Sequence, residues 1–283
     1  MNTVDFSKFN VHAQTHVGVH VDSSIVRKVV ALFSSAVFPG YYDTMPEEQK
    51  HAELYYGILS LASSLPKLET SPQDIATGLM EKLPALKASV WTDVSSIYDA
   101  DPAAKDPAEI ILCYPSVKAM LHYRLAHALY QLGLPLVPRM ITEMAHSETG
   151  IDIHPGAQIG DYFGIDHGTG VVIGETAIVG AHVRIYQGVT LGAKSFRYDE
   201  KGKAISGPRH PIIEDNVTIY SNSSILGRIT IGHDSIIGGN IWQTESLPPY
   251  SRVIQGKSIA THFTDGGGIL GKFLYLRNMW NRF

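Results

Sequence analysis

Aliphatic residues recur every six positions through much of the second half of the chain. The first run contains Ile153, Ile159, Ile165, Val171, Ala177, Val183 and Val189, and the second contains Ile213, Ile219, Ile225, Ile231 and Ile237. A six-residue period fits neither an α-helix nor an alternating strand, and it is typical of a parallel β-helix built from hexapeptide repeats. We therefore predict a solenoid in which these side chains stack inward. The glycines that often follow them are expected at the corners between strands.

The earlier part of the chain has the three- and four-residue apolar spacing of amphipathic helices. Stripes of this kind occur at residues 26–37 and 54–61, and most clearly from Val117 to Leu132. They predict a bundle of helices whose apolar faces pack against one another.

Local residues predict where two of these helices begin, end or bend. Ser116 is the predicted N-cap of the helix that contains Val117, and Gly133 is its predicted stop. The longest helical stretch, residues 73–98, contains Pro84. Because proline removes a helical hydrogen bond and clashes with the preceding turn, we expect a break or kink there.

These patterns predict an all-α helical domain at residues 1–145, followed by a parallel β-helix at residues 146–260. Residues 193–210 are polar, charged and glycine-bearing, and they interrupt the repeat. We predict that this segment leaves the solenoid as an excursion loop, and long loops in compact domains often carry function. Residues 261–283 lack the repeat but are apolar, and we expect a C-terminal tail packed on its own or a neighbouring subunit.

The composition excludes several classes of protein. There are 23 Lys and Arg against 27 Asp and Glu, a net charge of −4, so nothing favours nucleic acid or an anionic membrane as a partner. A single cysteine, Cys113, excludes an intrachain disulfide framework and a multi-cysteine zinc site. The start of the chain lacks the order of a secretory signal, and no stretch has the ~18 apolar residues of a spanning helix. We expect a cytoplasmic protein.

Several segments together closely resemble the serine O-acetyltransferases. In the repeat region they are residues 150–160 (GIDIHPGAQIG), 165–170 (IDHGTG), 172–176 (VIGET), 187–192 (QGVTLG) and 209–211 (RHP), and in the helical part 101–102 (DP) and 123–127 (YRLAH). The resemblance extends from about Asp101 to Gly256. It implies an N-terminal helical domain followed by a left-handed parallel β-helix. It also implies transfer of acetyl from acetyl-CoA to the hydroxyl of L-serine, which gives O-acetylserine for cysteine biosynthesis.

The resemblance assigns the catalytic roles to His167 and Asp152. A serine hydroxyl is a poor nucleophile, so a base with a pKa near neutrality is needed to take its proton, and histidine suits that range. His167 is then the general base, and Asp152 orients its ring in a direct transfer without an acyl-enzyme. The two residues are 15 positions apart. With coils of 18 residues, we expect them on neighbouring coils, Asp152 three positions past the level of His167.

The resemblance also assigns residues to both charged groups of serine. Asp101 and Asp166 match the positions that hold the amino group. Arg209 matches the position that pairs with the carboxylate, which a guanidinium can bind through two hydrogen bonds, and His210 is expected beside it. In the family this composite site lies between adjacent solenoids of a trimer.

The implied co-substrate is acetyl-CoA, and no metal is expected. Gly192, Ala193 and Ser221 match positions that contact the pantetheine arm, and their small size suits a close approach of the coenzyme to the backbone. Cysteine carries the same amino and carboxylate groups as serine, so feedback inhibition by cysteine is implied as well.

The resemblance implies an oligomer and one protein partner. The solenoids are expected to form a trimer, and the helical domains to join two trimers into a hexamer. Family members often end in an isoleucine that docks into O-acetylserine sulfhydrylase. This chain ends in Phe283, so we expect that sulfhydrylase to bind poorly or not at all.

Three alternatives remain open on the residues alone. The chain could be a hexapeptide acyltransferase for another acceptor, such as a sugar, an antibiotic or homoserine. It could be a zinc carbonic anhydrase of the β-helix type, which needs three histidines on one metal; the histidines available are His154, His167, His182, His210 and His233. It could also be a scaffold without catalytic activity.

Overall fold

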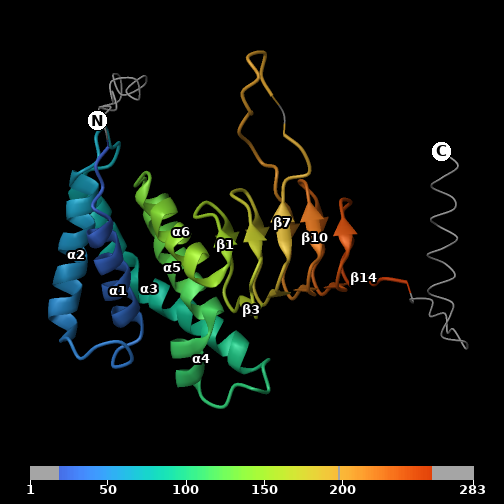
Figure 1. Ribbon diagram of the computed structural model, residues 1–283, viewed down its shortest axis with the longest axis horizontal. Helices are drawn as coiled ribbons and strands as arrows, with labels where there is room; N and C mark the ends of the chain where they lie inside the picture. The colour runs from blue at the N-terminus through green and yellow to red at the C-terminus, as the bar shows by residue number, and fades with distance from the viewer. Residues whose placement is uncertain (1–18, 197, 257–283) are drawn as a thin grey trace, which may run out of the picture.

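Helices form the first part of the chain and a parallel β-solenoid forms the second (Figure 1). The computed structural model describes residues 19–196 and 198–256. The predicted tail at residues 261–283, including Phe283, lies outside the described residues.

Within the described residues, six helices precede the solenoid. They are α1 (Ser23–Val37), α2 (Glu47–Ser63), α3 (Pro72–Tyr98), α4 (Pro107–Cys113), α5 (Pro115–Gln131) and α6 (Val137–Thr149). The predicted apolar stripes are confirmed as core: Val26, Leu54 and Leu125, for example, are each at most 1% exposed. Gly133, with φ of +80°, follows the end of α5 as predicted.

The structure differs from two details predicted for the helices, a break at Pro84 and an N-cap at Ser116. Pro84 does not break α3, which runs through it for 27 residues. Leu79, Leu83 and Val90, on either side of this proline, are buried, and their packing offsets the missing hydrogen bond. Ser116 is not the N-cap of α5, because the helix begins one residue earlier, at Pro115. The first turn tolerates a proline because its N–H would have no helical partner there.

The solenoid has three parallel sheets, each with one strand from every coil that it spans. The first contains β1 (Asp152–Ile153), β4 (Val172–Ile173), β7 (Thr190–Gly192), β10 (Ser224–Leu226) and β13 (Trp242–Gln243). The second contains β2 (Gln158–Ile159), β5 (Ile178–Val179), β8 (Ile212–Ile213) and β11 (Thr230–Ile231). The third contains β3 (Gly164–Asp166), β6 (Arg184–Tyr186), β9 (Thr218–Ile219), β12 (Ile236–Ile237) and β14 (Arg252–Val253). The predicted fold class is confirmed.

The six-residue series is buried as predicted, but it is not one continuous ladder. The Cα partner of Ile153 is Ile173, 20 residues later, whereas the partner of Val172 is Thr190, 18 residues later. Five residues (167–171) separate β3 from β4, where three separate β6 from β7. The first coil therefore has two extra residues, in the corner that contains His167. Beyond this corner the first run continues at a second buried position, two residues before the one that Ile153 occupies, and the second run returns to the position of Ile153.

This longer coil corrects the predicted relation between Asp152 and His167. Asp152 is level with Val172, which follows His167 by five residues rather than three. The glycines predicted at the corners are found there, and close approach rather than left-handed backbone requires them. Gly160 is required by close approach, because a Cβ there would lie 2.7 Å from the backbone of Gly180. Left-handed backbone at the corners is instead adopted mainly by residues with side chains, such as His167, His182 and Asn222.

Helix α5 caps the open end of the solenoid. Amide groups of the first coil donate to the second coil, as Gln158 does to Ala177 at 2.9 Å. Carbonyls of the first coil are bonded by three side chains of α5, all within the YRLAH segment. Tyr123 Oη donates to Ala157 O at 2.6 Å and His127 Nδ1 contacts Pro155 O at 2.8 Å. Arg124 donates to two further carbonyls. An end of a solenoid needs such partners for its unpaired backbone groups.

The excursion loop leaves the solenoid between β7 and β8 and projects well away from the coils (Figure 1). An antiparallel bridge between Tyr198 and Ala204 ties its two arms together. Among the described residues, no helix has the length and apolar character needed to cross a membrane.

Candidate active site

Asp101 and Asp166 lie together where α3 meets the solenoid. Asp166 ends β3, and Asp101 follows the end of α3, where its N–H donates to Ile97 O at 2.9 Å. Both carboxylates line one small pocket, together with Ile97, Gly164 and Arg184. The structure therefore brings together the two acidic residues predicted to bind an amino group, although they are 65 positions apart in the sequence.

Tyr114 also belongs to this cluster, although it was not among the residues predicted from the sequence. Its Oη donates to Asp101 Oδ2 at 2.6 Å. This hydrogen bond, a second one from Ala103 N and the nearby His167 lower the pKa of Asp101. The same bond raises the pKa of Tyr114 to about 12, so at neutral pH Asp101 is a carboxylate and Tyr114 is its donor. A lone tyrosine before a proline follows no pattern that would have marked it.

His167 stands at the edge of this cluster, on the longer corner. Its side chain is 75% exposed, and its Nε2 lies 3.9 Å from Asp166 Oδ1. The backbone is left-handed at His167 (φ 56°) and at Gly168 (φ 95°). A Cβ at Gly168 would also lie 2.5 Å from the side chain of Ile151. Close packing under the corner thus holds the imidazole outward, where a substrate can reach it.

Asp152 is engaged by another residue. Its carboxylate Oδ1 lies 3.3 Å from Arg139 Nη1, and Arg139 also pairs with Glu143 on the same helix, α6. Asp152 and His167 are both described, and no hydrogen bond or ion pair joins them. The predicted pair therefore lies at one edge of the solenoid without being in contact.

Arg209 and His210 lie at the other end of β4 from His167. Arg209 Nη2 pairs with Glu175 Oε2 at 2.6 Å. The Nδ1 of His210 accepts a hydrogen bond from Thr176 N at 3.1 Å. His210 is 7% exposed, and burial, together with the charge of Arg209, lowers its pKa to about 4. A Cβ at Gly174 would lie 2.1 Å from the ring, so this glycine makes the space that His210 fills.

The residues matched to the coenzyme are divided in the same way. Gly192 ends β7 and Ala193 follows it, next to a groove between the excursion loop and β10 that is lined by Lys194 and Arg228 among others. Ser221 follows β9, which shares a sheet with β3 and therefore lies along the edge that carries Asp166. Within one chain, the predicted site residues therefore form two clusters, one with His167 before β4 and one with Arg209 beyond its other end.

One group of described residues has three possible metal-ligand side chains whose ligand atoms lie within 4.8 Å of one another. It consists of Glu143, His146 and Asp152. Arg139 pairs with both carboxylates, so a cation already occupies this position. The group holds one histidine, where the zinc alternative needs three.

Comparison of the sequence finds serine acetyltransferases among the similar proteins. The chain is 53% identical over 203 residues to a plasmid serine acetyltransferase of Synechococcus elongatus, an alignment that covers 71% of this chain and 64% of the relative. It is 43% identical over 188 residues to a serine acetyltransferase of Staphylococcus xylosus, covering 66% of this chain and 82% of the relative. No protein-family model matches the chain.

Solved structures show the same likeness. Serine acetyltransferase 1 of Entamoeba histolytica, in complex with L-cysteine, is 36% identical with a TM-score of 0.72, and the match covers 83% of this chain and 87% of that one. Isoform 3 from the same organism, in complex with cysteine, is 33% identical with a TM-score of 0.71, covering 86% of each chain. The chain spans 64%, 63% and 54% of the length of three curated relatives, two from Synechococcus elongatus and one from Synechocystis.

Proposed function

The chain belongs to the serine acetyltransferase family, and we propose that it transfers the acetyl group of acetyl-CoA to the hydroxyl of L-serine. The observation that carries the proposal is the cluster of Asp101, Asp166 and His167, in which two carboxylates lie beside an exposed imidazole. Carboxylates can hold the ammonium group of an amino acid while an imidazole removes a hydroxyl proton.

In the proposed reaction, His167 takes the hydroxyl proton of serine as the serine oxygen attacks the thioester carbonyl. The carbon–sulfur bond then breaks, the acetyl group remains on serine, and the coenzyme thiolate receives the proton from the imidazolium. The thiolate is a good leaving group, so neither a covalent acyl-enzyme nor a metal is required by this chemistry.

Asp152 remains in the proposal as the carboxylate that orients His167. It begins β1, whose partner β4 follows the His167 corner directly. Asp152 Oδ1 lies 3.3 Å from Arg139 Nη1, so contact with the ring requires the side chain of Asp152 or of His167 to move. Asp166, whose Oδ1 is 3.9 Å from the ring, is close enough to stabilise the imidazolium electrostatically in either arrangement.

Serine binding is proposed to use two chains of a trimer. Asp101 and Asp166 of one chain hold the amino group, and Arg209 of the neighbouring chain, with His210 behind it, holds the carboxylate. The separation of these residues into two clusters supports this arrangement, because a cyclic trimer places different edges of neighbouring subunits face to face. The helical domains are proposed to join two trimers into a hexamer.

Acetyl-CoA is proposed to lie in the groove between neighbouring solenoids. Gly192 and Ala193 of one chain and Ser221 of the other would meet the pantetheine arm, and Lys194 and Arg228 supply positive charge beside the first two. Cysteine is the proposed feedback inhibitor, because it presents the same amino and carboxylate groups as serine. Two of the similar structures were solved with cysteine bound.

The proposal is tested by measuring thiol release from acetyl-CoA with serine, homoserine and a sugar as acceptors. We expect release with serine, and a fall of at least about a hundredfold in His167→Ala, the usual contribution of a general base. His182→Ala is the matched control, because His182 also lies on a corner of the solenoid, between β5 and β6, with a left-handed backbone of φ 57° and an exposed side chain. Release with homoserine or a sugar alone would overturn the substrate, and no release with any acceptor would overturn the activity.

A further inference from the structure

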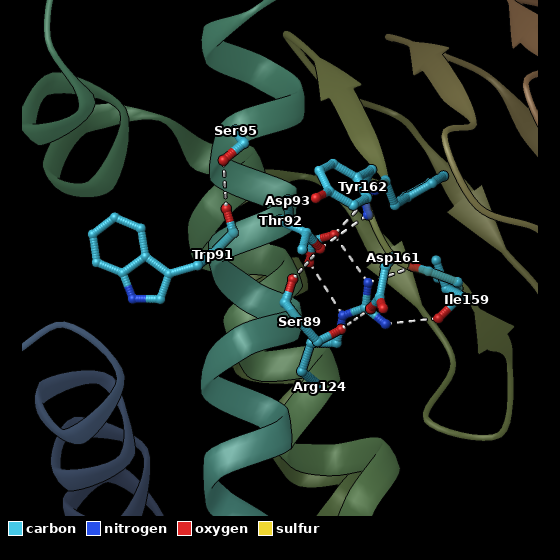
Figure 2. Close-up of polar contacts among 11 residues, drawn as sticks. Ser89, Trp91, Thr92, Asp93, Ser95, Arg124, Ile159, Asp161 and Tyr162 are labelled. Carbon is cyan, nitrogen blue, oxygen red and sulfur yellow. Dashed lines mark hydrogen bonds and ion pairs between the residues drawn. The ribbon is translucent and has the colours of Figure 1, made fainter.

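A buried ion pair joins two helices directly above the first coil of the solenoid. Asp93 on α3 is 1% exposed, and Arg124 on α5 is 7% exposed. Arg124 Nη2 donates to Asp93 Oδ1 at 2.9 Å, and Arg124 Nε donates to Asp93 Oδ2 at 3.1 Å. Figure 2 shows the two side chains facing Ile159, while Trp91 on α3 points to the opposite side.

Both members of the pair also bind the backbone of the first coil. Arg124 donates to Ile159 O and to Gly160 O, each at 2.6 Å. Asp93 Oδ1 accepts a hydrogen bond from Phe163 N at 3.1 Å. The neighbouring turns of α3 add contacts to the same segment, including Tyr162 N to Thr92 Oγ1 at 3.0 Å. The pair therefore connects α3, α5 and the segment that leads into β3.

These connections converge on the two elements that carry the acidic residues of the candidate site. Phe163 immediately precedes β3, which ends at Asp166. Asp93 lies five residues before the end of α3, after which Asp101 hydrogen-bonds back to Ile97. Further along α3, Arg184 Nη2 donates to Ser96 O at 3.2 Å. A shift of α3 along the solenoid would thus change the separation of Asp101 and Asp166.

Stability alone does not explain this pair. Burying two charges carries a desolvation penalty that can exceed their mutual attraction, and apolar residues of similar volume often serve a fold equally well. Burial raises the pKa of Asp93 to about 6 against the opposing effect of Arg124. Unlike an apolar contact, the pair makes directional hydrogen bonds. The guanidinium of Arg124 bonds both carboxylate oxygens of Asp93 and two carbonyls of the first coil, which fixes the orientation of α3 on that coil.

We propose that Asp93 and Arg124 are positioning residues of the serine site, which lock α3 onto the first coil so that Asp101 is held against Asp166. The kinetic consequences of this proposal rest on the proposed function, whereas the attachment of α3 to the first coil does not depend on it. Neither residue contacts the site, and both act through Asp101.

The kinetic test uses Arg124→Lys, which keeps the charge but loses the planar fork. We expect the KM for serine to rise about tenfold while the KM for acetyl-CoA changes by less than about twofold, because only the amino-group contacts are displaced. Lys118→Arg is the matched control, a substitution on the same helix in an exposed pair with Glu148, and it should leave both values unchanged. Parallel rises in both KM values would overturn the proposal.

A double-mutant cycle tests whether the pair acts through Asp101. In an Asp101→Ala background, Arg124→Lys should change the KM for serine by less than about twofold, because the contact that it displaces is already missing. If the two effects multiply instead, Arg124 acts elsewhere and the proposal fails.

Hydrogen exchange tests the lock without relying on any activity. In Arg124→Lys, and in Asp93→Asn as a second variant, exchange at the amides of residues 97–104 and 163–166 should accelerate about tenfold or more. The amides of β9 and β12 should keep their protection, since local opening is confined to one cooperative unit. Unchanged exchange at residues 97–104 would overturn the lock. A failure of the proposed function would appear separately, as no serine-dependent release by the unmodified chain.

Discussion

The imidazole of His210 shows how burial limits what a residue can do. It lies in the solenoid wall, where Thr176 donates to its Nδ1 and Gly174 leaves space for the ring. Its pKa, lowered to about 4, keeps it neutral at physiological pH with its proton assigned to Nε2. In the proposed site His210 is thus a neutral hydrogen-bond donor beside Arg209 rather than a second cation.

The lowered pKa of His210 predicts a loss of stability in acid. The unfolded chain binds a proton at His210 below its ordinary pKa of about 6.5, whereas the folded chain does so only near pH 4, so falling pH favours unfolding. Between pH 7 and pH 5 the wild-type protein should lose about 2 kcal/mol more than His210→Gln, which cannot be protonated. Denaturation of both proteins across this pH range measures the difference in their free energies of unfolding. Glu175, His154 and Arg228, the other charges near the ring, are present in both proteins, so their own titration largely cancels from the comparison. Parallel pH curves would contradict the prediction.

At the scale of elements, one short segment of α5 both caps the solenoid and contributes to the ion pair with α3. The side chains of Tyr123, Arg124 and His127 all bond carbonyls of the first coil. The YRLAH segment that matches the family therefore forms the junction between helices and solenoid rather than a place where substrate binds. The same helix supplies half of the Asp93–Arg124 pair. An element that caps the solenoid is therefore also the one that aligns α3 with it.

The capping role predicts the effect of Tyr123→Phe. The substitution keeps the ring but leaves the buried Ala157 carbonyl without its hydrogen-bond donor, which should lower the free energy of unfolding by about 1–3 kcal/mol. Tyr130→Phe is the control, because Tyr130 lies on the same helix but is 44% exposed. Chemical denaturation compares the two variants. Equal losses, or none in Tyr123→Phe, would show that this carbonyl does not depend on α5.

At the scale of the whole molecule, one chain does not assemble the candidate site. Asp101, Asp166 and His167 gather where α3 meets β3, whereas Arg209 and His210 are held by Glu175 and Thr176 beyond β4. The ion pair between Arg209 and Glu175 fixes the guanidinium on its own edge. If serine needs both clusters, a second copy of the chain must bring the missing one.

A composite site predicts that two inactive variants restore each other. Neither His167→Ala nor Arg209→Ala should be active alone, but trimers formed from an equal mixture should regain about a quarter of wild-type activity, the fraction of interfaces that pair an intact His167 with an intact Arg209. Co-refolding of the two variants followed by the thiol-release assay measures this. A mixture of Arg209→Ala with a chain that carries both substitutions should stay inactive. No recovery in the first mixture would place both residues in one site of a single chain.

The sequence by itself determined the class of fold, from helices to a hexapeptide solenoid, because inward-facing side chains repeat with the local geometry of the backbone and need no knowledge of distant partners. It also determined the family, through segments such as IDHGTG and RHP. Only the tertiary structure decided that the first coil has 20 residues, that Asp152 is held by Arg139, and that Tyr114 donates to Asp101. It alone also showed that the residues matched to serine binding form two clusters. Each of these depends on how elements far apart in the chain pack together, and no periodic pattern records that packing.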